Sequence, residues 1–391
     1  MSYQLSPDQI EALQTIGRWY RSGTQRYVTL GGYAGTGKTT MLGHVRQALR
    51  DNDPDVKVAF CAFTGKAVRV LDQTLKRQGV SRKGDSLTTI HGLIYTTELG
   101  SDGQVTGWRR RQTIKADLIM VDEASMVTED IWKDLLSYKV PILAVGDHGQ
   151  LPPIGTNFNL MNEPMIRLEK VYRQAIDSPI VEVATLARTT GTIAPGRYGD
   201  EVVKYDRHSN ELGAAMDELL EAWSPEWLVL CGYNHTRVRL NRELRARRGF
   251  ETPNPEPGEQ LICLRNNTAG KLYNGMTGTL KWIQSVSGDV EATWWEAGIM
   301  IDDTERHCYL MREQFGSRET IAKVPPSPEP KVRGDLFDFG YALTVHKAQG
   351  SSADTVLLFE ERNKHMNDDD WRRWLYTAVT RAERQLIIIG D

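Results

Sequence analysis

The chain contains 391 residues, 40% of them hydrophobic and 25% charged, and its formal net charge is −3 at pH 7. This length and composition predict a soluble protein of two or three domains. The net charge argues against a protein that coats nucleic acid without specificity, because such proteins are usually more basic. No apolar run reaches the roughly 18 residues of a membrane-spanning helix, and the N-terminal segment lacks the basic and apolar parts of a secretion signal. The four cysteines form no C-x-x-C pair, which predicts reduced thiols in a cytoplasmic protein.

Four short β-branched or apolar runs in the first 150 residues predict buried strands. Apolar residues at helical spacing follow the first run from residue 38 and the second run from residue 65. Strands that alternate with helices predict a parallel sheet with functional side chains at the carboxyl ends of its strands. The predicted strands are 26–31, 56–63, 116–125 and 140–147.

A β-hairpin is predicted at residues 94–111, between the second helix and the third strand. Its strand-like flanks are separated by Asp102-Gly103, a dipeptide that favours tight turns. The second flank, GWRRRQ (107–112), is basic and contains Trp108, which can stack on a nucleic-acid base. A solvated hairpin without a binding role is the alternative interpretation.

The later part of the chain changes its pattern twice. Strands and helices resume after residue 165, give way to short β-like runs with Gly and Pro turns from about 254, and resume again from 334. We therefore predict an α/β fold with a small β-barrel inserted in its second domain. The predicted divisions are 1–164 for the first domain, 165–253 and 334–391 for the second, and 254–333 for the insertion.

A glycine-rich segment predicts the nucleotide site. Residues 32–39, GYAGTGKT, fit G-x-x-x-x-G-K-[ST] and stand between a predicted strand and a predicted helix. Backbone N–H groups of such a loop surround phosphates, its Lys neutralises the β- and γ-phosphate oxygens, and its Thr ligates Mg²⁺. The alternative is an incidental Gly-rich turn. The residues expected to hold ATP and Mg²⁺ are Gly35, Thr36, Gly37, Lys38, Thr39 and Thr40.

Two carboxylates at the end of the third predicted strand complete this site. In LIMVDEAS, Asp122 is expected to bind Mg²⁺ and Glu123 to activate the attacking water as a general base. A water activator suits hydrolysis and has no use in a small-molecule kinase. The alternative is that the Asp-Glu pair only caps the next helix.

With these two motifs, the chain resembles a superfamily 1 helicase of the RecD-like and phage Dda-like branch over residues 5–389. The resemblance implies two RecA-like P-loop domains, with a β-hairpin insertion in the first and an SH3-like β-barrel insertion in the second. KLYNGMTGTL (271–280) resembles that barrel, for which a plain surface barrel is the alternative. The other segments that carry the resemblance are LSPDQIEAL (5–13), AFTGKAVRVL (62–71), LTTIHGL (87–93), VGDHGQLPPIG (145–155), LEKVYRQ (168–174) and YTAVTRAERQL (376–386).

The resemblance implies further roles around the nucleotide. Gln9 would read the adenine, and Gln150 would sense the γ-phosphate and couple it to a bound strand. Arg173 and Arg381 would be arginine fingers that stabilise the transition-state charge when the domains close. Each arginine taken singly is also explained as a solvated surface cation.

TVHKAQGSS (344–352) resembles the fifth helicase motif, in which Thr344, His346 and Lys347 would hold strand phosphates and Gly350 would lie near the nucleotide. A serine hydrolase is excluded because no G-x-S-x-G elbow surrounds Ser351.

Other side chains are expected to contact a single strand through phosphates or base stacking. For Phe63 the alternative is burial at a strand end. The expected contacts are Phe63, Thr64, Lys66 and His91 in the first domain, Trp108 in the hairpin, and Asn234 in the second domain.

The resemblance implies a monomeric, ATP- and Mg²⁺-dependent DNA helicase that moves five-prime to three-prime on single-stranded DNA. Its implied partners are single-stranded DNA, tailed duplex DNA and replication or recombination proteins, without a membrane. Two other classes stay open: an ATP-controlled nucleic-acid binding module that never separates strands, and the motor part of a larger nuclease or relaxase assembly.

Overall fold

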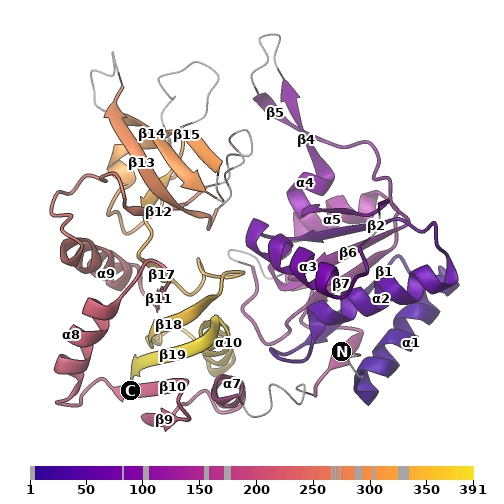
Figure 1. Cartoon of the computed structure of the whole chain (residues 1–391), viewed down its shortest axis with the longest axis horizontal. Helices are drawn as coiled ribbons and strands as arrows, with labels where there is room; N and C mark the ends of the chain where they lie inside the picture. Colours follow the sequence, from indigo (N-terminus) through magenta and orange to yellow (C-terminus); the bar gives the residue numbers. More distant parts are fainter. Residues whose placement is uncertain are drawn as a thin grey trace. The chain divides into compact units, whose positions relative to one another are not determined.

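The computed structural model describes residues 5–81, 83–99, 105–153, 158–170, 178–265, 267, 270, 272, 274–286, 293–301, 304–324 and 334–391. The chain divides into two compact units, which are described separately (Figure 1). Within the described residues, no helix is both long and apolar enough to cross a membrane. The first unit contains Met1–Thr96, Arg110–Ile193 and Asn367–Thr380, and the second contains Thr97–Arg109, Ala194–Met366 and Arg381–Asp391.

The first unit is built on a six-stranded sheet in which every described strand pair is parallel. Its central strands are fully buried, because helices cover both faces of the sheet. The predicted parallel α/β sheet is thereby confirmed. The sheet order is β3 (Ser86–Thr89), β2 (Val58–Ala62), β6 (Leu118–Asp122), β7 (Ile142–Gly146), β1 (Tyr27–Gly32) and β8 (Ile166–Leu168).

Alternate residues of each strand enter two different hydrophobic cores. Phe60 packs in the core beneath α1 (Pro7–Ser22), α2 (Lys38–Asn52) and α3 (Gly65–Arg77). Its neighbour Cys61 packs in the opposite core, with α4 (Ile90–Ile94) and α5 (Glu129–Ser137). This alternation follows from the two-residue period of a strand, which directs successive side chains to opposite faces of the sheet.

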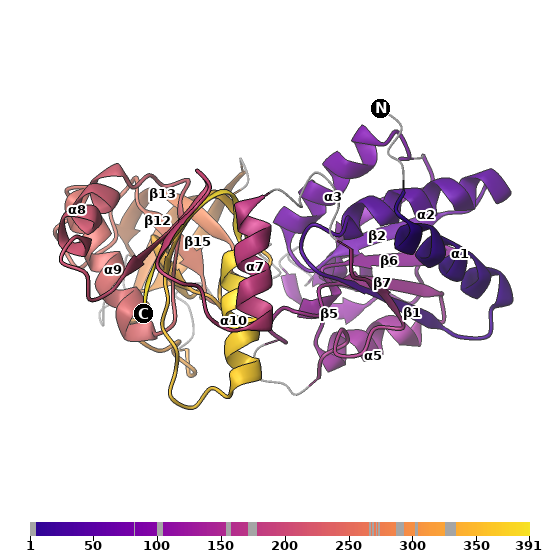
Figure 2. The same ribbon diagram turned by 90° about the horizontal axis from the view of Figure 1, so that it is seen from below.

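Two helices from distant parts of the chain lie side by side in the first unit, α7 (Pro179–Thr189) and α10 (Asp368–Val379) (Figure 2). Trp371 Nε1 of α10 donates a hydrogen bond of 2.8 Å to the carbonyl oxygen of Gly191. The stacked rings of Trp371 and Trp374, with centroids 5.1 Å apart, are both buried.

Strands β4 (Tyr95–Leu99) and β5 (Val105–Arg110) pair as a two-stranded sheet at the position of the expected hairpin. The start of β4 and the end of β5 are attached to α5. Tyr95 Oη donates to Asp134 Oδ2 over 2.6 Å, and the Arg110 guanidinium lies 3.2 Å from the other oxygen of this carboxylate. The side chain of Trp108 lies outside the described residues.

The second unit contains another six-stranded sheet, which is parallel except at β9. Helices α8 (Leu212–Ala222) and α9 (Asn234–Arg247) belong to the same unit. The sheet order is β17 (Ala342–Thr344), β11 (Leu228–Cys231), β18 (Ala353–Phe359), β19 (Ala382–Gly390), β10 (Val202–Asp206) and β9 (Gly196–Tyr198).

The second unit also holds a five-stranded sheet in which all described pairs are antiparallel. Its order is β15 (Thr304–Met311), β14 (Trp294–Ile301), β13 (Thr277–Ser285), β12 (Gln260–Cys263) and β16 (Phe337–Phe339). Two buried ion pairs connect α9 with β16 and with the residue before β12: Arg237 with Asp338 at 2.5 Å, and Arg245 with Glu259 at 2.5 Å.

Each sheet extends slightly beyond the boundaries that the sequence suggested. β8 joins the first sheet after residue 164, and β16 joins the antiparallel sheet after residue 333. Helix α10, expected with the second domain, belongs to the first compact unit.

Candidate nucleotide site

The glycine-rich loop joins the end of β1 to the start of α2. Gly35 and Gly37 both have φ of 78°, in the left-handed region that a residue with a Cβ rarely adopts. A Cβ on Gly32 would lie 2.5 Å from Thr36 Oγ1. Among the described residues no side chain caps the N-terminus of α2, so its backbone N–H groups suit an anionic ligand.

Gln9 lies against this loop, as expected. Its side chain is buried, and its Nε2 donates 3.0 Å to the carbonyl oxygen of Thr36. Its Oε1 accepts from the backbone N–H of Ser6 at 3.0 Å, which closes a capping box at the start of α1. Gln9 therefore links the first helix to the phosphate loop, and adenine recognition by this side chain stays a prediction.

Lys38 is folded back over its own loop. Its Nζ donates to the carbonyl oxygen of Tyr33 at 2.9 Å and to Asp147 Oδ2 at 3.3 Å. Asp147 follows β7 and is 1% exposed. Asp147 stands within VGDHGQLPPIG, and the sequence pattern alone predicted no role for it. The buried carboxylate is the counter-charge of Lys38 in this structure.

The side-chain oxygens of Thr39 and Asp122 lie next to each other. Thr39 Oγ1 donates to Asp122 Oδ2 over 3.0 Å, which is close to the separation of neighbouring oxygens around an octahedral Mg²⁺ with ligands at about 2.1 Å. Burial raises the pKa of Asp122 to about 6, and the Glu123 charge adds to the shift. Mg²⁺ commonly uses one or two protein carboxylates and completes its shell with water and phosphate, so this pair fits the ion.

Glu123 has an unusual backbone and an unsatisfied side chain. Its φ is 53°, a conformation uncommon for a non-glycine residue. Within the described residues, Glu123 Oε2 is buried without a hydrogen-bond partner, and the side chain caps no helix. The capping alternative is therefore not supported at Glu123. A buried carboxylate oxygen with free acceptor capacity suits a general base that receives a proton from water.

The loop after β7 places Gln150 beside the same site. Gln150 is buried, and its backbone carbonyl accepts from the Arg373 guanidinium at 3.3 Å. A second side chain of α10 also enters the site, since Tyr376 Oη donates to Asp147 Oδ2 at 2.8 Å. Neither Arg373 nor Tyr376 was predicted from the sequence. Tyr376 stands first in the quoted segment YTAVTRAERQL, which was the available signal.

The remaining expected nucleotide residues belong to other parts of the chain. Arg381 and Gly350 belong to the second unit, where the buried Arg381 guanidinium donates to the carbonyl oxygen of Ser351 at 3.1 Å. Gly350 has a φ of 72°, which favours glycine. Arg173 lies outside the described residues.

Expected strand contacts of the first unit gather at the ends of β2 and β3. The rings of Phe63 and His91 are 6.0 Å apart, and Phe63 is half-buried against the core. The burial alternative therefore holds in part, and stacking of Phe63 on a base stays a prediction. Burial lowers the pKa of His91, which keeps its imidazole neutral at pH 7. Thr64 Oγ1 accepts from Ala67 N at 3.2 Å and caps α3. The side chain of Lys66 lies outside the described residues.

Expected strand contacts of the second unit share one edge of its sheet. Thr344 ends β17 in register with Cys231 of β11, and Asn234 begins α9 three residues later. Burial lowers the pKa of His346. Burial and the neighbouring Arg237 charge lower the pKa of Lys347 to about 8. The loop thus holds a lysine whose charge is costly until an anion accompanies it.

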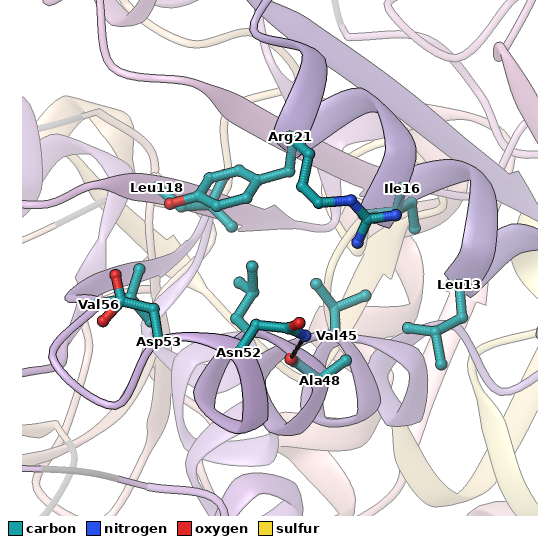
Figure 3. Close-up of a pocket in the computed structure, with 12 residues that line it drawn as sticks. Leu13, Ile16, Arg21, Val45, Ala48, Asn52, Asp53, Val56 and Leu118 are labelled. Atoms are coloured by element: carbon teal, nitrogen blue, oxygen red, sulfur yellow. Dashed lines mark hydrogen bonds between the residues drawn. The ribbon is translucent and has the colours of Figure 1, made fainter.

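A separate apolar cavity of about 210 Å³ lies between α1 and α2 (Figure 3). Its walls include Leu13, Ile16 and Val45, with Arg21 and Asp53 among the polar lining residues. The cavity is lined by the later part of α2, whereas the phosphate loop meets the first residue of that helix. It contains none of the predicted nucleotide residues.

Comparison with known proteins identifies the family. The sequence pattern of the AAA domain family matches residues 4–210, more than half of the chain. The chain belongs to this family. The pattern of the UvrD-like helicase C-terminal domain matches residues 339–389.

Relatives and solved structures refine this assignment. The chain is 26% identical over 386 residues to the ATP-dependent RecD2 DNA helicase of Deinococcus radiodurans, covering 94% of this chain and 47% of that protein. It is 26% identical over 405 residues to the RecBCD enzyme subunit RecD of Mycobacterium tuberculosis, covering 94% and 67%. The fold resembles Pif1 helicase from Bacteroides in complex with ADP-AlF3 and single-stranded DNA, with a TM-score of 0.53, 15% identity and coverage of 100% and 93%. The RecD-like superfamily 1 resemblance is confirmed, and the chain spans about half the length of the RecD2 relative.

Proposed function

We propose that the chain is an ATP-hydrolysing DNA helicase that moves five-prime to three-prime on single-stranded DNA and separates duplex strands. The observation that carries the proposal is the Thr39–Asp122 oxygen pair beside Glu123 Oε2, which is buried without a hydrogen-bond partner in the described part of the chain, all at the end of a parallel sheet. This arrangement can hold a nucleotide, a cation and an attacking water together. The RecD2 relative, an ATP-dependent DNA helicase, supports the same activity.

In this proposal each amino-acid residue of the nucleotide site has one role. The backbone of Gly35–Thr40 binds the phosphates, Lys38 neutralises the terminal ones, and Thr39 and Asp122 hold Mg²⁺, which supplies charge neutralisation at the phosphate oxygens. Glu123 takes the proton from the attacking water. Gln9 reads the adenine and Gln150 senses the γ-phosphate. Arg173, Arg381 and Gly350 approach the nucleotide from the second RecA-like domain, so that hydrolysis depends on closure.

Strand binding follows from two groups of residues. Asn234, Thr344, His346 and Lys347 contact phosphates from the second domain, where the shared sheet edge of Asn234 and Thr344 supports the assignment. Phe63, Thr64, Lys66 and His91 bind from the first domain. The Thr64 oxygen accepts the cap hydrogen bond, and its own O–H proton is a donor suited to a phosphate.

The domain division belongs to the proposal as well. We assign residues 1–164 to the first RecA-like domain, 165–253 and 334–391 to the second, and 254–333 to an SH3-like insertion. Beyond these bounds β8 completes the first sheet, β16 completes the antiparallel sheet, and α10 packs in the first compact unit. The five-stranded antiparallel sheet supports the assignment of the insertion. The β4–β5 sheet is assigned as the pin that splits the duplex, with Trp108 stacking on a base.

The test is ATP-driven strand separation on two matched duplexes, one with a five-prime tail and one with a three-prime tail. Unwinding of the five-prime-tailed duplex alone supports the activity and its direction. Unwinding only from the three-prime tail overturns the direction, and separation of neither duplex, with ATPase still stimulated by single strands, favours the ATP-controlled binding module.

A second candidate is the motor part of a larger assembly. The favouring observation is that a chain of this length matches 67% of a protein that is a subunit of RecBCD. Monomeric behaviour in sedimentation, together with unwinding by the purified chain alone, would favour the stand-alone helicase. Co-purification with replication or recombination proteins, and activity only in their presence, would favour the assembly.

A further inference from the structure

The hydroxyl group of Tyr376 lies between the phosphate loop and a buried carboxylate. It accepts a hydrogen bond of 2.7 Å from the backbone N–H of Ala34 and donates one of 2.8 Å to Asp147 Oδ2. Tyr376 is 1% exposed, and α10 belongs to the same compact unit as the loop. One phenol oxygen therefore bridges two elements that both face the nucleotide.

Helix α10 holds the loop that follows β7 at three further points. The Arg373 guanidinium donates to the carbonyl oxygens of His148 and Gln150, at 2.8 and 3.3 Å. Thr377 Oγ1 accepts from the backbone N–H of Leu151 at 2.9 Å. This loop also fits tightly beneath Tyr376, because a Cβ on Gly149 would lie 2.9 Å from the Tyr376 ring. The position of the Tyr376 hydroxyl is therefore fixed by its surroundings.

Asp147 is shared between Tyr376 and Lys38. Its Oδ2 faces the Tyr376 hydroxyl at 2.8 Å and Lys38 Nζ at 3.3 Å, while its Oδ1 accepts from the backbone N–H of Gly149 at 2.9 Å. Lys38 must leave this carboxylate to reach a terminal phosphate. An ionised group that is buried and loses its counter-charge is costly unless other donors remain.

We propose that Tyr376 is a positioning residue for nucleotide binding: its hydroxyl, oriented by the Ala34 N–H, keeps Asp147 hydrogen-bonded when Lys38 moves to the phosphates. The inference rests on the proposed ATP site and adds a residue to it. Burial and the nearby Asp147 charge raise the pKa of Tyr376 well above its ordinary value, so the phenol stays a donor. Tyr376 then acts on the nucleotide through Asp147 and Lys38 and does not touch it.

The test compares Tyr376→Phe with wild type in the binding of a fluorescent, non-hydrolysable ATP analogue in the presence of Mg²⁺. Loss of the hydroxyl leaves Asp147 more dependent on Lys38, so the Kd of the analogue should rise about tenfold, the scale of one hydrogen bond to a charged group. An unchanged or lowered Kd overturns the proposal.

Tyr341→Phe is the matched control. Tyr341 is also buried, its hydroxyl donates to a carboxylate, Glu259 Oε1, at 3.0 Å, and it belongs to the second unit. A purely structural role for such phenols would lower the Tm of both variants and leave both Kd values unchanged. The proposal requires that only Tyr376→Phe changes the Kd.

A double-mutant cycle with Asp147→Asn shows whether Tyr376 acts through this carboxylate. Asparagine carries no charge to hold Lys38, so Tyr376→Phe should change the Kd less than about twofold in that background. A full tenfold effect there overturns the coupling. If Tyr376→Phe does not fold, Asp147→Asn alone decides: it should bind the analogue at least as tightly as wild type, and weaker binding overturns the proposal.

These outcomes are separable from failure of the proposed function. Wild type that binds the analogue but separates no strands would contradict the helicase proposal and leave the Tyr376 measurement valid. Wild type that does not bind the analogue would overturn the ATP site and the role of Tyr376 together.

Discussion

Thr39 and Asp122 stand 83 residues apart in the sequence, and their side-chain oxygens lie 3.0 Å from each other. Thr39 is the second residue of α2, and Asp122 is the last residue of β6. The parallel sheet brings them together because the strands that precede them end at the same edge. Two oxygens at this distance, one of them from a carboxylate, have the spacing of neighbouring Mg²⁺ ligands.

Thr39→Ala should therefore weaken the use of Mg²⁺. The variant lacks one of two protein oxygens, and we expect the Mg²⁺ concentration for half-maximal ATPase to rise about tenfold, on the scale of one lost contact to a charged group. Thr39→Ser keeps the oxygen and should stay within about twofold of wild type. Equal Mg²⁺ dependence in wild type and Thr39→Ala would remove Thr39 from the site.

Glu123→Gln should separate nucleotide binding from hydrolysis. The amide has nearly the same shape as the carboxylate but cannot accept the proton of an attacking water. We expect kcat to fall about 10²- to 10⁴-fold, the usual contribution of a general base, with the Kd of the non-hydrolysable analogue changed little. Near-normal turnover would show that another group activates the water. Glu129→Gln is the control, because the Glu129 side chain is exposed and pairs only with Lys133 among the described contacts.

The sequence predicts the residues that line the nucleotide site more readily than the residues that hold them in place. Lys38, Thr39 and Asp122 follow from local strand–loop–helix patterns, which place each side chain at the sheet edge. The hydrogen bond between Tyr376 and Asp147 joins residues 229 positions apart, and α10 reads locally as an amphipathic helix whose apolar face could pack on any core. Long-range contacts of this kind depend on tertiary packing, which cannot be predicted from the spacing of apolar residues along the sequence.

Glu123 is a second example of a role that the sequence alone does not decide. An Asp-Glu pair after a strand fits both a helix cap and a general base, because both uses need a carboxylate at a strand end. The backbone φ of 53° and the unpartnered buried Oε2 separate the two uses. Neither property is visible in the sequence.

Arg381→Ala should slow hydrolysis while nucleotide still binds. An arginine finger stabilises charge that develops only in the transition state, and such residues contribute about 10³- to 10⁵-fold to kcat in related phosphoryl transfers. We expect a loss on this scale in strand-stimulated ATPase, with the Kd of the analogue within about threefold of wild type. Arg384→Ala, at a side chain that is 80% exposed, should behave like wild type. Wild-type kcat in Arg381→Ala would exclude the finger role.

Trp108→Ala should impair strand separation more than strand-stimulated ATPase. A stacked ring contributes about 1–3 kcal/mol per base, and a ring in the pin acts on the duplex junction. We expect unwinding to fall at least fivefold with ATPase within twofold of wild type. Trp108→Phe keeps an aromatic face and should retain most of the unwinding. Equal losses of both activities would reject the pin assignment.

Lys347 gives strand binding a pH dependence of known sign. Burial and the Arg237 charge lower its pKa to about 8, so in the absence of DNA the ammonium loses its proton as the pH rises through 8. A phosphate binds the charged form and raises the pKa in the complex. The affinity for single-stranded DNA should therefore fall with rising pH, by up to about tenfold per unit above pH 8, and be nearly constant below pH 7.

Lys347→Arg isolates this effect, because a guanidinium stays charged across the whole range. Fluorescence anisotropy of a labelled oligothymidine, at constant ionic strength between pH 6.5 and 9.5, measures both proteins under the same conditions. The arginine variant should bind with almost the same affinity throughout. Two outcomes would show that Lys347 does not supply the phosphate contact: a wild-type affinity that does not fall above pH 8, or an equal fall of affinity in the arginine variant. In either case the proton of Lys347 would be irrelevant to DNA binding.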